Sequence, residues 1–132
     1  AAARLCADLP DVRFVVDHLA KPDIAHGGFD HWSALMAPFG AVPHVWCKLS
    51  GMVTEAEWPA QTAEDLKPYV ARSLELFGED RVMFGSDWPV STLAAPYGEV
   101  KRALESALGP IPDATRAKIF GGNAVRFYRL DG

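Results

Sequence analysis

The chain has 132 residues, which is enough for one domain with a buried core. Hydrophobic residues make up 49% of it and charged residues 23%, as in ordinary globular proteins. The formal net charge of -4 offers no basic patch for nucleic acid, and no stretch reaches the roughly 20 apolar residues that span a bilayer, so we expect neither nucleic acid nor a membrane as a partner.

One structural unit recurs three times along the chain. In each copy a short apolar strand acquires polar residues at its carboxyl end, and a long loop, a helical stretch and a tight turn follow. Residues 1–7 come before the first copy; they resemble the end of a helix and do not begin with Met, so we expect part of the protein to lie upstream. Cys6 and Cys47 have apolar surroundings, which predicts buried free thiols and fits a cytoplasmic location.

The first predicted strand spans residues 12–18 and is rich in β-branched and aromatic residues. It ends in Asp17 and His18, and a long loop with glycine and proline follows. Asp30 is placed to cap a short helix that closes near Gly40.

The second predicted strand spans residues 45–50, and its side chains alternate between two faces. One face carries Val45, Cys47 and Leu49. The other face carries Trp46, Lys48 and Ser50. A long loop leads to a helix with Pro68 near its start and Gly78 as its end.

The third predicted strand spans residues 81–86 and leads directly into Asp87. A helix that ends at Gly109 comes next. Asp113 is expected to cap a final helix, a glycine pair to break that helix, and Asn123 to cap a last turn.

Strands that alternate with helices indicate an α/β fold with a parallel sheet, so we expect the three strands to be parallel and adjacent. In such folds ligands bind beyond the carboxyl ends of the strands. The polar residues and the longest loops of this chain gather at those ends. We therefore expect His18, Lys48 and Asp87 to converge there on one ligand.

Asp87 is the first candidate for chemistry, because it follows a strand directly. A carboxylate there can bind a metal or take a proton from an attacking water, although Asp87 can equally cap the next loop. His18 can ligate a metal, contact substrate or be purely structural. Asp17, next to it, should point the opposite way.

Lys48 is expected on the ligand side of the sheet, since the opposite face of its strand is apolar. A buried ammonium needs a partner: a substrate carboxylate, Asp87, or another carboxylate in a structural ion pair. Trp88 and Trp58 are candidates for the pocket wall.

Four segments of the chain form recognisable motifs: 17–22 (DHLAKP), 47–51 (CKLSG), 81–89 (RVMFGSDWP) and 119–124 (IFGGNA). Together they resemble one known family, the amidohydrolase-2 branch of the amidohydrolase superfamily, and within it the TIM-barrel lactone hydrolases. The resemblance covers nearly the whole chain in matching order, and the Gly-Ser-Asp-Trp-Pro phrase after a strand is its most specific part.

The resemblance implies that residues 1–132 form the carboxyl-terminal part of a (β/α)₈ barrel whose amino-terminal strands are absent, so that the missing half would be a partner of this chain. It also implies a hydrolase that opens a small-molecule lactone by activated-water attack. Asp87 would be the catalytic base and a metal ligand, with His18 as a second ligand of a divalent metal such as zinc. Some lactonases of this branch work without a metal, so the resemblance also allows a site that binds none. Lys48 and Ser50 lie where the family lines its pocket, without a defined role there, and we expect Lys48, Ser50 and Trp88 to contact substrate.

The family has a His-x-His pair on its first strand, and no such pair occurs here. Two other interpretations therefore stay open. One is a metal-dependent decarboxylase of the same superfamily, and the other is a catalytically inert segment that needs its missing half.

Overall fold

The computed structural model describes residues 1–130, and its centre is a three-stranded parallel sheet in the order β1-β2-β3. The strands are β1 (Phe14–Val16), β2 (Val45–Leu49) and β3 (Val82–Phe84). The predicted parallel, adjacent strands are confirmed, and the fold is that of part of a (β/α)₈ barrel. The hydrogen-bonded strands are shorter than the predicted ones: β1 and β3 begin later, at Phe14 and Val82, and all three end before the polar residues that follow them.

The β2 strand is the central one, and its register fixes the height of its two neighbours. Val16 and Val82 both lie opposite Cys47, one on each side. Strand pairs in a parallel sheet run in one direction, so the three carboxyl ends finish at the same edge. Side chains just beyond those ends are therefore brought together.

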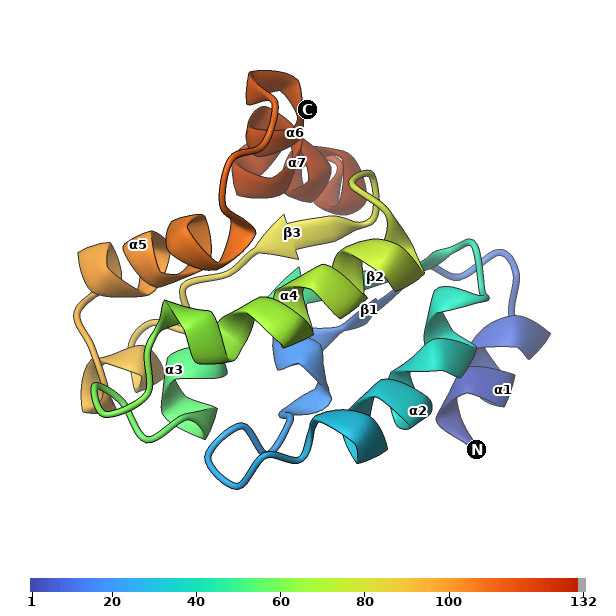
Figure 1. The fold of residues 1–132 in the computed structure, drawn as a ribbon. Helices are drawn as coiled ribbons and strands as arrows, with labels where there is room; N and C mark the ends of the chain where they lie inside the picture. The colour runs from blue at the N-terminus through green and yellow to red at the C-terminus, as the bar shows by residue number, and fades with distance from the viewer. Residues whose placement is uncertain (131–132) are drawn as a thin grey trace.

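One face of the sheet is covered by a layer of three helices, α2 (Phe29–Gly40), α4 (Ala63–Phe77) and α5 (Tyr97–Leu108), with α4 packed between the other two (Figure 1). The predicted apolar face of β2 points into this layer, as Val45, Cys47 and Leu49 are all buried in the main core. The predicted thiols are likewise buried and free. The burial of these apolar side chains is the main interaction that holds the helix layer against this face of the sheet.

The opposite face of the sheet carries a smaller apolar cluster of Trp46, Met83 and Phe127. Phe127 comes from the last helical segment, which runs without interruption through α6 (Asp113–Ala117), η3 (Lys118–Gly122) and α7 (Asn123–Tyr128). These elements lie beside β3 at the top of Figure 1.

Three expectations for this last segment are wrong. Asp113 does not cap α6 but is its first residue, after Pro112, and no side chain caps this helix. The glycine pair does not break the helix but lies in η3, a π-helical turn that continues it. Asn123 does not cap α7; its side-chain amide donates instead to the carbonyl oxygens of Glu79 (2.7 Å) and Val82 (2.6 Å). Asn123 is 1% exposed, so its two bonds tie the last helix to the turn before β3 and to the first residue of β3.

The remaining elements are short: α1 (Ala2–Asp8), η1 (Asp17–Ala20), α3 (Met52–Glu55) and η2 (Val90–Leu93). The last three follow the carboxyl ends of the three strands, and they build the edge of the sheet at which a ligand is expected. None of the helices in residues 1–130 is long and apolar enough to cross a membrane.

Arg81 holds the opposite edge of the sheet together. Its guanidinium donates to four backbone carbonyl oxygens at distances of 2.8–3.3 Å, those of Gly40, Val42, Val45 and Leu76. Partial burial lowers the pKa of this guanidinium, and the ring of Phe77 lies beneath it, 5.5 Å from the carbon of the group to the ring centroid. One side chain thus satisfies carbonyl groups from α2, β2 and α4 and the turns between them.

We predict that Arg81→Met lowers the free energy of unfolding by about 2–4 kcal/mol, because the substitution keeps the apolar stem but leaves several carbonyl groups without a donor. Chemical denaturation of the protein that carries this chain measures the change. Arg4→Met is the matched control, since the Arg4 side chain is 89% exposed, and its effect should stay within about 0.5 kcal/mol. Equal effects of the two substitutions would contradict the role given to Arg81.

Candidate active site

The predicted convergence of His18, Lys48 and Asp87 at one edge of the sheet is confirmed. His18 Nε2 lies 3.4 Å from Asp87 Oδ1 and 3.5 Å from Asp17 Oδ2. Lys48 Nζ lies 3.2 Å from Asp17 Oδ1. The polar residues from all three strand ends therefore form one connected cluster, although they are up to 70 positions apart in the chain.

A left-handed turn after β1 sets the position of His18. The backbone φ angles of residues 18–21 are 49°, 50°, 56° and 54°, although none of these residues is glycine. Such angles are unfavourable by roughly 1–2 kcal/mol per residue, so the surrounding structure must hold them. Leu19 is fully buried, and the indole of Trp32 donates to its carbonyl oxygen at 2.7 Å. These contacts pin the turn and direct His18 toward Asp87.

Asp87 also has a positive φ, 56°, directly after β3. Asp tolerates this region better than most residues, which gives a physical reason for its presence here. Its side chain is only 12% exposed. Strain at two facing positions of one site is typical of functional residues that are held in a required geometry.

The expectation that Asp17 points away from His18 is wrong. It rested on the alternation of side chains along a strand, but the strand ends at Val16 and η1 begins at Asp17. Asp17 instead bridges His18 and Lys48 with its two carboxylate oxygens. Partial burial acts to lower the pKa of Lys48, but its interactions with Tyr128 and Asp17 outweigh this and raise it above the usual value. Lys48 thus pairs with Asp17 and not with Asp87.

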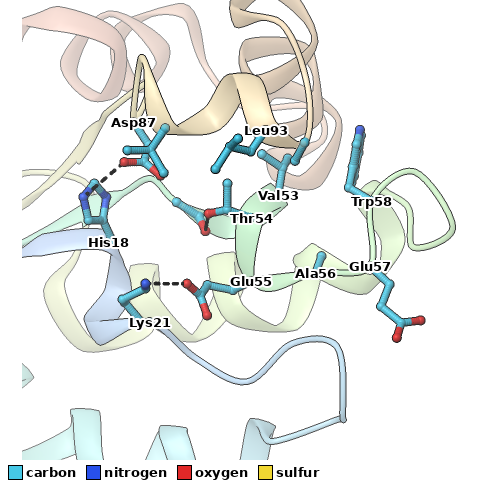
Figure 2. Close-up of a pocket in the computed structure, with 13 residues that line it drawn as sticks. His18, Lys21, Val53, Thr54, Glu55, Ala56, Glu57, Trp58, Asp87 and Leu93 are labelled. Carbon is cyan, nitrogen blue, oxygen red and sulfur yellow. Dashed lines mark hydrogen bonds and ion pairs between the residues drawn. The ribbon is translucent and has the colours of Figure 1, made fainter.

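A pocket of about 530 Å³ opens in front of this cluster (Figure 2). His18 and Asp87 lie at one end of it, and Trp58 lies across from them. Apolar side chains from α3 and from the segment around η2 line another part of the wall, namely Val53, Val90, Leu93 and Ala94. Small-molecule sites typically have volumes of about 300–1,000 Å³, and the volume of this pocket lies in that range. A largely apolar wall with a few polar groups is also typical of such sites.

A second charged pair, Lys21 with Glu55, lines the same pocket. The Nζ–Oε1 distance is 2.9 Å, and the hydrogen bond to Glu55 raises the pKa of Lys21. Figure 2 shows this pair beside the His18–Asp87 pair. Neither Lys21 nor Glu55 was singled out from the sequence as a site residue. The available signal was position alone, since each residue lies within a few positions of a strand end.

The three residues predicted to contact substrate occupy different places. Ser50 is 2% exposed, and its Oγ lies 2.8 Å from His18 Nδ1, behind the imidazole. Lys48 faces Asp17 as described. Trp88 is 68% exposed and stands outside the set of residues that line the pocket, whereas Trp58 lines it and donates to Glu99 Oε1 at 2.6 Å.

Residues 1–130 do not form a metal site by themselves. His18 and Asp87 offer one nitrogen and one carboxylate, whereas catalytic zinc usually has three protein ligands. Within residues 1–130 no group of three or more His, Cys, Asp or Glu side chains is arranged to hold an ion. A metal held by His18 and Asp87 would need further ligands from outside residues 1–130.

Comparison with known proteins agrees with this architecture. The amidohydrolase family model matches residues 1–130. The L-fucono-1,5-lactonase of Burkholderia ambifaria is 44% identical over 129 residues, which cover 92% of this chain and 43% of that protein. The L-fucono-1,5-lactonase of Burkholderia multivorans is 39% identical, covering 92% of this chain and 48% of its own length.

A solved structure agrees in the same way. An amidohydrolase from Burkholderia multivorans with bound zinc superposes with a TM-score of 0.88 at 40% identity, over 96% of this chain and 47% of that one. The chain thus spans about half the length of the relatives that it matches. With a family model that matches all the described residues and a site at the carboxyl ends of parallel strands, this chain belongs to the amidohydrolase family.

Proposed function

We propose that the protein that carries this chain hydrolyses a small lactone by attack of an activated water, with Asp87 as the general base. The observation that carries the proposal is the placement of a nearly buried carboxylate, Asp87, against His18 Nε2 at the end of the pocket. The similarity to two lactonases supports the choice of a cyclic ester as substrate.

The chemistry follows from the two side chains. The water oxygen attacks the ester carbonyl carbon while Asp87 takes its proton. The ring C–O bond then breaks, and Asp87 returns the proton to the leaving alkoxide oxygen, so that the product is an open-chain hydroxy acid. His18 lies on the same wall, where a ring N–H can donate to the carbonyl oxygen as negative charge develops on it.

The charges along the pocket favour an uncharged substrate. Three carboxylates, Glu55, Glu57 and Asp87, line it together with a single ammonium, that of Lys21. Because Lys21 is already paired with Glu55, a substrate carboxylate would meet an excess of negative charge. Hydroxyl groups, in contrast, can donate to Glu55 and accept from Lys21. We therefore propose a neutral lactone that carries hydroxyl groups.

Asp87→Asn should lower the turnover number by about 10²–10⁴-fold, because the amide cannot take up a proton near neutral pH. The fold should survive, since Asn tolerates a positive φ as well as Asp does. A steady-state assay on a lactone panel, paired with a thermal melt, measures both effects. Asp8→Asn serves as the control, with a side chain that is 67% exposed and remote from the pocket. Near-normal turnover by the Asp87 variant, on a lactone that the native protein opens, would remove Asp87 from the role of base.

A second prediction concerns selectivity. For two lactones of the same ring size, we expect the hydroxylated neutral one to be hydrolysed with a kcat/KM at least about tenfold higher than one that bears a carboxylate. Glu55→Gln should narrow this ratio, because it removes a negative charge and frees the Lys21 ammonium. Glu64→Gln, on the outer surface of α4 with a side chain that is 73% exposed, should leave the ratio unchanged. A native preference for the anionic lactone would refute the argument from charge.

A further inference from the structure

We propose that Ser50 is a positioning residue whose hydroxyl donates a hydrogen bond to His18 Nδ1 and thereby keeps the ring proton on Nε2, where it faces the pocket and Asp87. The reactive role of that proton rests on the proposed function, whereas the tautomer itself does not. The geometry assigns Ser50 to the imidazole, since its Oγ lies 2.8 Å from Nδ1 and the residue is 2% exposed.

The groups on the other side of the ring decide which nitrogen holds the proton. Nε2 lies 3.4 Å from Asp87 Oδ1 and 3.5 Å from Asp17 Oδ2. Ionised carboxylates only accept hydrogen bonds, so a lone pair on Nε2 would face two further lone pairs, whereas an N–H there is attracted to both. A neutral ring then has its lone pair on Nδ1, and a neighbour that can donate is required at that position.

Ser50 meets this requirement because it can supply a proton without adding a charge. A carboxylate or a carbonyl oxygen at the same place would instead hold the proton on Nδ1. Lys48, two positions earlier on the same face of β2, is engaged with Asp17 and does not compete for the ring. The preference for the Nε2–H form therefore comes from two directions, from the carboxylates in front of the ring and from the hydroxyl behind it.

Two glycines make room for this arrangement. A Cβ atom on Gly51 would come within 3.0 Å of His18 Cβ and 3.1 Å of His18 Cγ, and the φ of Gly51, 69°, also disfavours any other residue there. A Cβ atom on Gly85 would come within 2.9 Å of Ser50 Cβ. Gly51 after β2 therefore leaves space for the His18 side chain, and Gly85 after β3 leaves space for Ser50.

The test measures the tautomer and the kinetics separately. In the native protein, treated with a chelator so that no metal occupies Nε2, the ¹⁵N chemical shifts of the His18 ring should show the proton on Nε2, with His18→Gln to assign the signals. In Ser50→Ala the Nδ1 signal should move, since its hydrogen-bond donor is lost. The turnover number should fall about tenfold or more with little change in KM, because the substrate still binds but the ring is less well held.

Two further variants guard against a merely structural effect. Ser50→Cys retains a weak donor and should lie between the native protein and Ser50→Ala in both measurements. Ser73→Ala is the matched control, because Ser73 is also fully buried but its hydroxyl donates to the carbonyl of Tyr69 within α4. It should leave both the His18 signals and the turnover unchanged.

The outcomes separate this proposal from the proposed function. A native His18 with its proton on Nδ1, or signals and turnover that do not change in Ser50→Ala, would overturn the role of Ser50. If Ser50→Ala does not fold, the tautomer of the native protein and the behaviour of Ser50→Cys still decide the matter. Full lactonase activity in Asp87→Asn would reject the proposed base without affecting the assignment of the tautomer.

Discussion

The site depends on one constraint, the parallel pairing of β2 with a strand on each side. Because Val16 and Val82 both lie opposite Cys47, the strands end at nearly the same height, and the next residues along each chain segment face one another. No single segment contains more than part of the site. Arg81 at the opposite edge, with four carbonyl oxygens from three elements around it, helps to hold this register, so that a residue remote from the pocket helps to position the groups that line it.

Much of this arrangement could be predicted because it follows from periodic patterns. The alternation in β2 separated the core side chains from Lys48 and Ser50, and the polar residues that follow each strand located the edge of the sheet that carries the site. The convergence of His18 and Asp87 at one edge followed from the parallel order of the strands, whereas the turn that directs His18 toward Asp87 was not predicted. The described residues also contain the predicted buried thiols, Cys6 and Cys47.

The parts that could not be predicted lie where periodicity ends. A left-handed turn of four residues without glycine has no local sequence signal, since the packing of Leu19 and Trp32 imposes it. That turn carries Asp17 into the site and places Lys21 on the pocket wall beside Glu55. The amide of Asn123 was assigned to a helix cap because Asn often has that role, whereas its two carbonyl acceptors belong to β3 and to the turn before it, more than 40 positions earlier in the chain. Contacts of this kind depend on the tertiary structure.

The acidic lining of the pocket has a further consequence for the reaction cycle. In the proposed reaction an uncharged ring becomes an open-chain acid, which loses its proton in neutral solution. The product therefore carries a negative charge, whereas the substrate is neutral. The carboxylates that line the pocket, those of Glu55, Glu57 and Asp87, lie next to the neutral substrate and then next to the negatively charged product. Under the proposed function, ring opening thus weakens the interaction between ligand and protein, and electrostatic repulsion favours release of the product.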